Sequence, residues 1–139
     1  MLKASFFETS YGDLEPEPLN PDWIKEGNPV AKSKYLLESP DKLLRAGIWE
    51  CTAGKFKFHY YFDEIIQVLE GEAHVDDGFT KRTLTPGTVV SFPLGMEADW
   101  HVPKYIRKTF VLRSLKPNRV RLAAWKVKQK VFSIAGIKR

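Results

Sequence analysis

Glu64 is the residue in this sequence that most clearly suggests chemistry. On an alternating strand it shares a face with Ile66 and Val68, so its carboxylate stands among apolar neighbours. A carboxylate in a protein interior is costly unless it is paired or hydrogen-bonded. The partners that we expect are Tyr60, Tyr61, Trp100 or an arginine. Glu64 is therefore our candidate catalytic residue, suited to general acid–base chemistry, and a structural role that ties two strands together is the alternative.

Aromatic side chains around Glu64 indicate a ligand-binding pocket. Phe56, Phe58 and Tyr60 alternate with Lys55 and Lys57, which places the rings on one face of a strand. Binding pockets are mostly apolar, with a few placed polar groups. The residues that we predict to bind a ligand are Phe56, Phe58, Tyr60, Glu64, Phe92 and Trp100. The alternative is that these rings fill the core and leave no room for a ligand.

The stretch that contains these groups has the pattern of strands joined by tight turns. Asp77 and Gly78 stand between two strand-like runs. This pair predicts a two-residue type I′ hairpin turn, because both central residues of that turn need positive φ. Pro86 and Gly87 mark the next turn, and residues 89–92 predict a short apolar strand.

Alternating segments extend this pattern to most of the chain. We predict a turn at residues 53–54, and strands at residues 43–51, 100–102, 105–112, 119–127 and 131–134. Residues 32–39 fit either a short strand or one helical turn. Since no segment predicts a convincing helix, the fold class is all-β, an antiparallel barrel or jelly roll whose body spans residues 45–113.

Residues 1–40 are predicted to form an N-terminal arm. Four prolines within residues 10–30 fix φ and remove backbone donors, which argues against regular structure there. The arm also carries apolar anchors: Leu14, Leu19, Trp23 and Ile24. It packs either on its own barrel or on a neighbouring subunit. Because exposed sheet edges must be covered or paired, we expect a homodimer to which the arm or a terminal strand contributes.

Six positions in the central stretch resemble the two sequence motifs of the cupin superfamily. They are Gly54, Glu64, Gly71, Gly87, Pro93 and Gly95. Six residues separate the glutamate from the next glycine of the first motif, and five separate the first glycine of the second motif from its proline. The resemblance covers residues 45–113 and implies a cupin-type antiparallel β-barrel, that is, a double-stranded β-helix or RmlC-like jelly roll.

A narrower resemblance points to one branch of the superfamily. Residues 49–54 (WECTAG), together with Trp100, are similar to the small single-domain branch that includes the cupin domain of ureidoglycine aminohydrolase. Many members of that branch have no assigned activity. The resemblance therefore implies a fold more strongly than a reaction, because one fold hosts many functions.

The resemblance also allows the metal-binding positions to be compared. Metal-binding cupins use two histidines and a glutamate from the first motif and a histidine from the second. Glu64 takes the glutamate position and His59 lies near the histidine pair, but Ala98 stands where the last histidine is expected. We therefore expect no metal or other cofactor. If a divalent transition metal binds, its ligands are His59, Glu64 and His101; otherwise both histidines are surface residues.

Composition and charge bound the remaining possibilities. The chain has 139 residues, which predicts a single domain over residues 1–139. Its net charge is +5, and residues 116–139 carry eight Lys or Arg and no Asp or Glu. Cys51 is the single cysteine, which fits a reducing compartment. No apolar run reaches the length of a membrane span, so we expect a soluble, cytoplasmic protein without a membrane partner.

Three functions remain open at this point. The first is a cupin of unassigned activity that binds a small polar organic molecule in its barrel. The second is a metal-dependent enzyme similar to ureidoglycine aminohydrolase. The third is a partner-binding or nucleic-acid-associated module that uses the basic residues 116–139, although a strand with a solvated basic face explains that segment better, so we do not expect nucleic acid as a partner.

Overall fold

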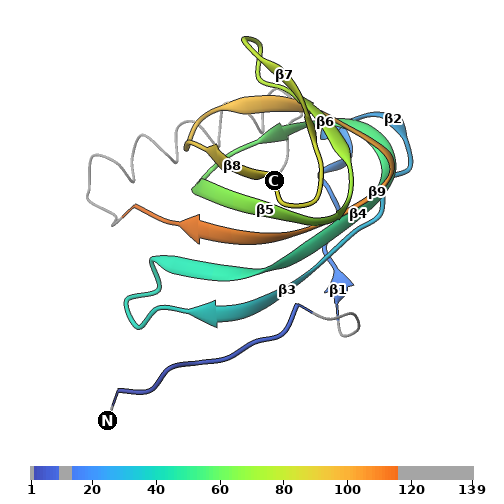
Figure 1. Cartoon of the computed structure of the whole chain (residues 1–139). Coiled ribbons are helices and arrows are strands. Elements are labelled where there is room, and N and C mark those ends of the chain that lie inside the picture. The colour runs from blue at the N-terminus through green and yellow to red at the C-terminus, as the bar shows by residue number, and fades with distance from the viewer. Residues whose placement is uncertain (1, 10–13, 116–139) are drawn as a thin grey trace.

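The computed structural model describes residues 2–9 and 14–115, and these residues are organised as antiparallel strands (Figure 1). The predicted strands at 119–127 and 131–134 lie outside the described residues. The described elements are β1 (Glu15–Pro16), a 3₁₀ turn η1 (Pro21–Trp23), β2 (Ile24–Gly27), β3 (Ala31–Glu38), β4 (Leu44–His59), β5 (Asp63–Gly71), β6 (Ala73–Asp76), β7 (Lys81–Leu84), β8 (Val89–Phe92) and β9 (Glu97–Arg113).

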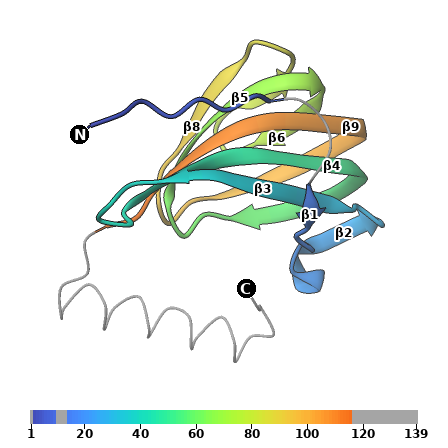
Figure 2. The same ribbon diagram turned by 90° about the horizontal axis from the view of Figure 1, so that it is seen from below.

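Two long strands, β4 and β9, form the centre of the sheet and pair with each other along most of their length. The first half of β4 pairs with β3 and its second half with β2. In the same way, β9 pairs with β6 near its start and with β5 towards its end, and β5 pairs with β8. The sheet curls around one core (Figures 1 and 2). The predicted all-β antiparallel jelly roll is therefore confirmed.

The register of the strands decides which side chains share a face. Residues opposite each other on neighbouring strands point to the same side of a sheet. Two inward rows matter for the site, one of Trp49, Lys108 and Val68 and one of Arg45, Leu112, Glu64 and Phe92. The odd and even positions of these strands thus separate a core side from an outer side, as the alternation in the sequence predicts.

Apolar side chains from all the longer strands fill the inside of the sheet. Phe56, Ile66 and Ile106 are almost completely buried. Each such side chain contributes about 1.5–3 kcal/mol by leaving water. The core is continuous from the β2 end of the molecule to the β8 end, because the buried residues of β4, β5 and β9 form one cluster.

The prediction that residues 10–30 lack regular structure is wrong. Asn20 caps the η1 turn by accepting a hydrogen bond from the Asp22 backbone N–H (3.0 Å). Pro21 begins that turn, where its missing donor costs nothing. Residues 24–27 contain no proline, so they are free to pair with β4 as β2.

The arm packs on its own barrel. Leu19 and Trp23 are buried, and Leu19 belongs to the core cluster. The Trp23 ring meets the edge of Phe58, with 5.1 Å between ring centroids. Residues 32–39, which fit either a strand or a helical turn, lie almost entirely in strand β3 beside β4. Residues 2–9 form no strand and run alongside the sheet (Figures 1 and 2).

Two predicted turns differ from the structure. The hairpin at Asp77 and Gly78 exists, but its loop spans residues 77–80 and Asp77 does not have positive φ. The Asp77 carboxylate accepts hydrogen bonds from the backbone N–H groups of Phe79 and Thr80 instead, which stabilises a longer loop. The predicted turn at residues 53–54 is a register shift within the continuous strand β4, that is, a bulge.

Gly71, in the first cupin-like motif, occupies a position that no other residue fits. Its φ is +73°, and a Cβ there would lie 1.9 Å from the Tyr105 carbonyl oxygen. The glycine therefore allows β5 to end directly against β9.

In the described part of the chain, no helix is long and apolar enough to cross a membrane.

Candidate ligand-binding cavity

A cavity of about 350 Å³ lies on the inner side of β4, β5 and β9, at the end of the molecule where β5 begins. Aromatic rings from β3, β4 and the turn before β5 supply most of its lining. The acidic and basic side chains that line it are Glu17, Arg45, His59, Glu64 and Lys108. An apolar cavity with a few placed polar groups is the usual form of a small-molecule site.

Glu64 and Lys108 form a buried ion pair in this cavity. The Lys108 ammonium donates a hydrogen bond to Glu64 Oε2 at 2.8 Å. The exposed fractions of the two side chains are 9% for Glu64 and 5% for Lys108. Glu64 thus faces the interior, as the sequence predicts, but its partner is a lysine that the sequence analysis did not consider.

Two tryptophans complete the surroundings of Lys108. Its ammonium lies 4.7 Å from the Trp49 ring centroid and 5.6 Å from the Trp100 ring centroid. The negative face of an aromatic ring attracts a cation, most strongly when water is excluded. A carboxylate and two indole rings therefore compensate the buried charge together. The signal in the sequence is parity, because Lys108 alternates with Ile106 and Phe110 and so shares their inward face.

Tyr60 links this pair to the aromatic core. Its hydroxyl accepts a hydrogen bond from Trp100 Nε1 at 3.0 Å, and its ring stacks on Phe92 with centroids 4.5 Å apart. Burial raises the pKa of Tyr60 well above its ordinary value, and the charge of Glu64 raises it further. Tyr60 therefore stays a neutral hydroxyl, able to bind a ligand through hydrogen bonds but not to act as a base.

His59 lies at the edge of the cavity and is buried, with 7% of its surface exposed. Its Nδ1 is 3.1 Å from Glu97 Oε1, and its ring packs beside Trp23. The interpretation of His59 as a surface residue is wrong because the arm covers the end of β4. Trp23 shields His59 from solvent, and the sequence alone did not indicate that Trp23 packs against the end of β4.

Arg45 is the second cation of the cavity that the sequence analysis missed. Its guanidinium carbon lies 5.1 Å from the Tyr35 ring centroid and 5.2 Å from the Phe62 ring centroid. The register places Arg45 in the same inward row as Leu112 and Glu64. An arginine near the start of a strand gives no distinctive pattern in the sequence, so register alone reveals its direction.

The predicted ligand-binding residues divide between this cavity and the core. Phe58, Tyr60 and Glu64 line the cavity. Trp100 is not part of the lining, but it contacts two residues that are, Lys108 and Tyr60. The Phe92 ring packs against Tyr60, while the buried Phe56 ring stacks on Trp100. The rings therefore fill part of the interior and still leave space for a ligand.

The structure does not bring the conditional metal ligands together. Glu64 faces inward, whereas His101 lies in register with Lys55 and His74 on the outer side of the sheet. His59 is placed against Glu97. Within residues 2–9 and 14–115, no group of three or more His, Cys, Asp or Glu side chains is arranged to hold a metal ion.

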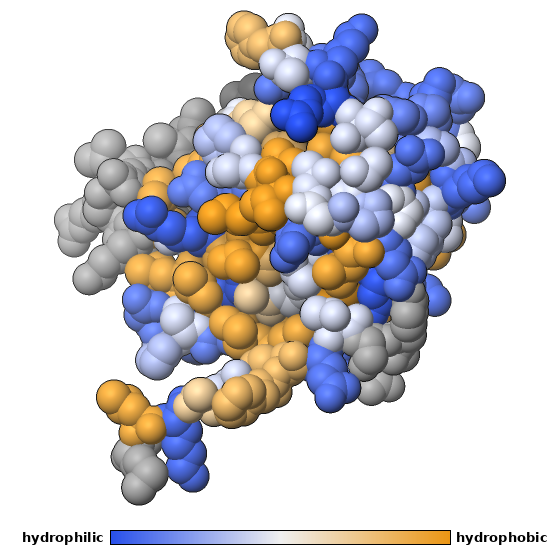
Figure 3. Space-filling model, viewed as in Figure 1, coloured by the Kyte–Doolittle hydropathy of each residue, from blue (hydrophilic) through white to orange (hydrophobic). Residues whose placement is uncertain are grey.

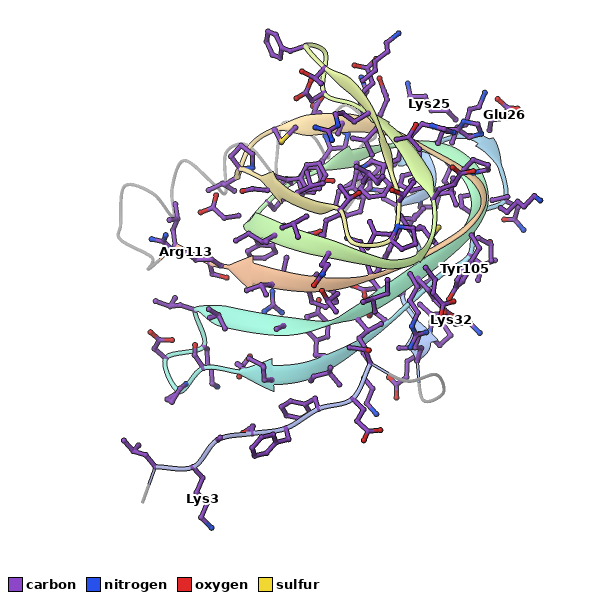
Figure 4. All side chains as sticks on the ribbon, viewed as in Figure 1. Lys3, Lys25, Glu26, Lys32, Tyr105 and Arg113 are labelled. Carbon is purple, nitrogen blue, oxygen red and sulfur yellow. The ribbon has the colours of Figure 1, made fainter. Side chains whose placement is uncertain are left out.

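A larger cavity, of about 640 Å³, lies on the outer side of β4, β6, β7 and β9. One cross-strand row crosses it, formed by Thr83, His74, His101 and Lys55. His74 Nδ1 is 2.8 Å from the Thr83 hydroxyl. Lys25 and Glu26 project from β2 at its border (Figure 4). It contains no buried ion pair of the kind that Glu64 and Lys108 form in the inner cavity: among its described residues, the pair of Lys57 and Asp99 is 36% and 56% exposed.

A separate set of charges fastens residues 2–9 to the outer side of the sheet. The Arg107 guanidinium is buried and donates to Glu50 Oε2 and to the Thr9 carbonyl oxygen, both at 3.1 Å. The Tyr105 hydroxyl donates to the same Glu50 oxygen at 2.6 Å. The position of Tyr105 on β9 can be followed in Figure 4. This network lies on the face opposite to the inner cavity and joins Thr9 to β4 and β9.

Comparison with known proteins agrees with the motifs in the sequence. Residues 38–110 match the model of the EutQ-like cupin domain. The ethanolamine utilization protein Q of Salmonella typhimurium is 25% identical, with a TM-score of 0.55 over 63% of this chain and 72% of that one. The Clostridium difficile EutQ protein is also 25% identical, with a TM-score of 0.55 over 67% and 76% of the two chains.

A third solved structure resembles the fold more completely. A protein of unknown function from Pseudomonas syringae pv. tomato gives a TM-score of 0.66 at 23% identity, over 73% of this chain and 44% of that one. No curated protein matches the sequence. The narrower resemblance to ureidoglycine aminohydrolase stays a prediction. The fold, the two motifs and the match over residues 38–110 together show that the chain belongs to the EutQ-like cupin family.

Proposed function

We propose that this protein binds a small polar organic molecule in the inner cavity, next to Glu64 and Lys108. The observation that carries the proposal is a buried, charged pair in the lining of a cavity of about 350 Å³. Replacing such a pair by packed apolar residues is often neutral or stabilising, so stability alone does not explain its presence. A role in ligand binding or in chemistry explains why the pair is present.

The pair also offers a way to move a proton. Glu64 accepts and Lys108 donates along one hydrogen bond of 2.8 Å, and the cavity gives a ligand access to both groups. A polar ligand that donates a hydrogen bond to the other Glu64 oxygen, Oε1, could transfer its own proton to that carboxylate and take it back, while Lys108 keeps its proton. Glu64 is thus the proposed acid–base group, and Lys108 is the positively charged partner that positions its carboxylate. Cys51, a buried free thiol, fits the cytoplasmic location that we propose.

Ligand capture tests the proposal. The protein purified under non-denaturing conditions is analysed by native mass spectrometry, and small polar metabolites are screened by isothermal titration calorimetry. We expect a ligand whose affinity falls at least tenfold in Glu64→Gln and in Lys108→Met. The matched control is Lys55→Met, which removes an exposed lysine from the outer face of β4. A ligand that binds all four proteins equally would place binding outside this cavity.

We also propose that the protein forms a homodimer. Three exposed apolar side chains, Leu37, Val111 and Ile65, stand in one cross-strand row on the outer face of β3, β9 and β5. Apolar residues also gather over β5 and β8 in Figure 3. A twofold partner would bury this row against its own copy.

Sedimentation equilibrium tests the dimer. We expect the dimer mass for the intact chain and a monomer mass for Ile65→Lys, which places a charge in the row. Phe79→Lys is the control, because Phe79 is exposed at the β6–β7 loop, outside the row. A monomer mass for the intact chain at micromolar concentration would exclude a stable dimer.

A further inference from the structure

The geometry of Arg45 points to the chemical class of ligand that the inner cavity binds. Its guanidinium carbon lies over two aromatic rings, 5.1 Å from the centroid of Tyr35 and 5.2 Å from that of Phe62. A cation–π contact attracts the charge through the ring face and does not supply a carboxylate or carbonyl acceptor. The guanidinium has five N–H donors, and these contacts leave room for it to donate to a ligand.

The other ionisable groups of the cavity already have partners. Lys108 donates to Glu64 at 2.8 Å, and Glu17 accepts a hydrogen bond from the Ser33 hydroxyl. His59 is 3.1 Å from Glu97. Arg45 differs from Lys108 in this respect, because no carboxylate among the described residues forms an ion pair with it.

The neighbours of Arg45 do not change this result. Glu38 stands opposite Arg45 on β3, but it is exposed and forms no ion pair with it. Glu64 lies in the same inward row, and its carboxylate is bonded to Lys108. A half-buried guanidinium placed over two rings is therefore ready for a carboxylate that the described chain does not supply.

We propose that Arg45 binds the carboxylate of a small organic acid, and that the ligand of this cavity belongs to that class. The inference rests on the proposed binding function of the inner cavity. A carboxylate has the planar, two-oxygen geometry that matches two parallel N–H donors of arginine. The contacts with the rings of Tyr35 and Phe62 hold the guanidinium in place in advance, so little side-chain freedom is lost when the acid binds.

The balance of charge favours a single negative group over a dianion. The lining carries two cations, Arg45 and Lys108, and two carboxylates, Glu64 and the solvent-exposed Glu17. The two carboxylates would repel a doubly charged phosphate more strongly than a single carboxylate. The aromatic lining of the cavity accommodates the apolar part of the acid. The carboxylate would lie at Arg45, and the rest of the molecule would extend towards Glu64 and Lys108.

Matched acids and amides test this inference, because each pair has the same shape and differs in charge. The pairs are acetate and acetamide, glycolate and glycolamide, and benzoate and benzamide. Calorimetric titrations at constant pH and ionic strength compare the intact protein with Arg45→Gln, Arg45→Lys and Arg113→Gln. Arg113 is an exposed arginine at the end of β9 (Figure 4) and serves as the control.

We expect at least one acid to bind the intact protein and Arg113→Gln at least tenfold more tightly than its amide. Arg45→Gln should abolish this preference, and Arg45→Lys should restore it only in part, because lysine lacks the planar fork. Circular dichroism of each variant checks that the fold is kept.

Other outcomes separate this inference from the proposed function. If amides bind as tightly as acids, and Lys108→Met weakens both, the cavity binds small molecules but does not select carboxylates. If the preference for acids survives in Arg45→Gln, another group binds the carboxylate and the inference is wrong. If no member of any pair binds, the class of ligand is wrong, while a different ligand captured from the purified protein would keep the binding function.

Discussion

The inner and outer faces of β4 and β9 carry the same kinds of charged side chain in opposite surroundings. Inside, Lys108 and Glu64 are 2.8 Å apart and almost fully buried. Outside, Lys55 and Glu26 are 3.2 Å apart, with 47% and 70% of their side chains exposed. Exposed pairs contribute little because water and salt screen them, whereas a buried pair fails badly when one member is lost. Burial, rather than charge, distinguishes the candidate site.

The largest effect that we expect comes from breaking the inner pair. Lys108→Met leaves the Glu64 carboxylate buried without its partner and should lower the free energy of unfolding by about 3–5 kcal/mol. Urea denaturation followed by circular dichroism measures the change. Lys55→Met on the outer face should cost at most about 1 kcal/mol. Equal losses at the two sites would remove the distinction between the faces.

A double replacement sharpens the comparison. Glu64→Leu combined with Lys108→Met removes both charges, so most of the stability lost in Lys108→Met should return. The same urea experiment measures the recovery, which we expect to reach within about 2 kcal/mol of the intact protein. Calorimetry should show that ligand binding does not return with it. A double variant as unstable as Lys108→Met would mean that the loss comes from packing rather than charge.

Tyr60→Phe should have an intermediate effect. It removes the oxygen that accepts the Trp100 indole N–H in the core and leaves that donor unsatisfied, at a cost of about 1–3 kcal/mol. Tyr105→Phe, on the outer side, should cost less, because Tyr105 is only partly buried. Thermal unfolding of the two variants gives the comparison, and a larger loss for Tyr105→Phe would contradict it.

The smallest effect concerns pH and Cys51. Burial raises the pKa of this thiol from 9.0 to about 12, although the charge of Lys108 opposes the shift. The unfolded chain therefore releases the thiol proton first, and stability should fall as the pH rises above 9. By pH 10 the loss should be about 1 kcal/mol. Urea titrations at pH 8 and pH 10 on the intact protein and Cys51→Ala measure it. The variant should lose less stability between these pH values, and its remaining slope comes from Tyr60, whose pKa is also raised.

The fold was predictable because its signals are local. Alternation and turn residues define most of the strands from residue 43 to residue 113, and the alternation also indicates which side chains share a face. The structure of residues 15–27 was not predictable in the same way. Residues 24–27 form β2 only because β4 offers a free edge there, and no local pattern reports that pairing.

The candidate site was predictable in part for a related reason. The inward direction of Glu64 follows from its strand, so burial of its carboxylate could be inferred. Its partner Lys108 comes from a strand 44 residues away, and Arg45 meets Tyr35 and Phe62 from two other segments. Contacts between distant segments depend on register and on bulges, such as the one near residue 53, which a single sequence does not reveal.

The central position of β9 has a consequence for how this protein is made. Residues 97–113 pair with β4, β5 and β6. These three strands are synthesised earlier, and they cannot complete their pairing until β9 has been made. Long-range pairing of this kind delays folding, because the entropy of closing the chain is lost before any contact repays it. During translation the nascent chain would therefore carry open strand edges until β9 leaves the ribosome, and this interval is when a chaperone would have the most to protect.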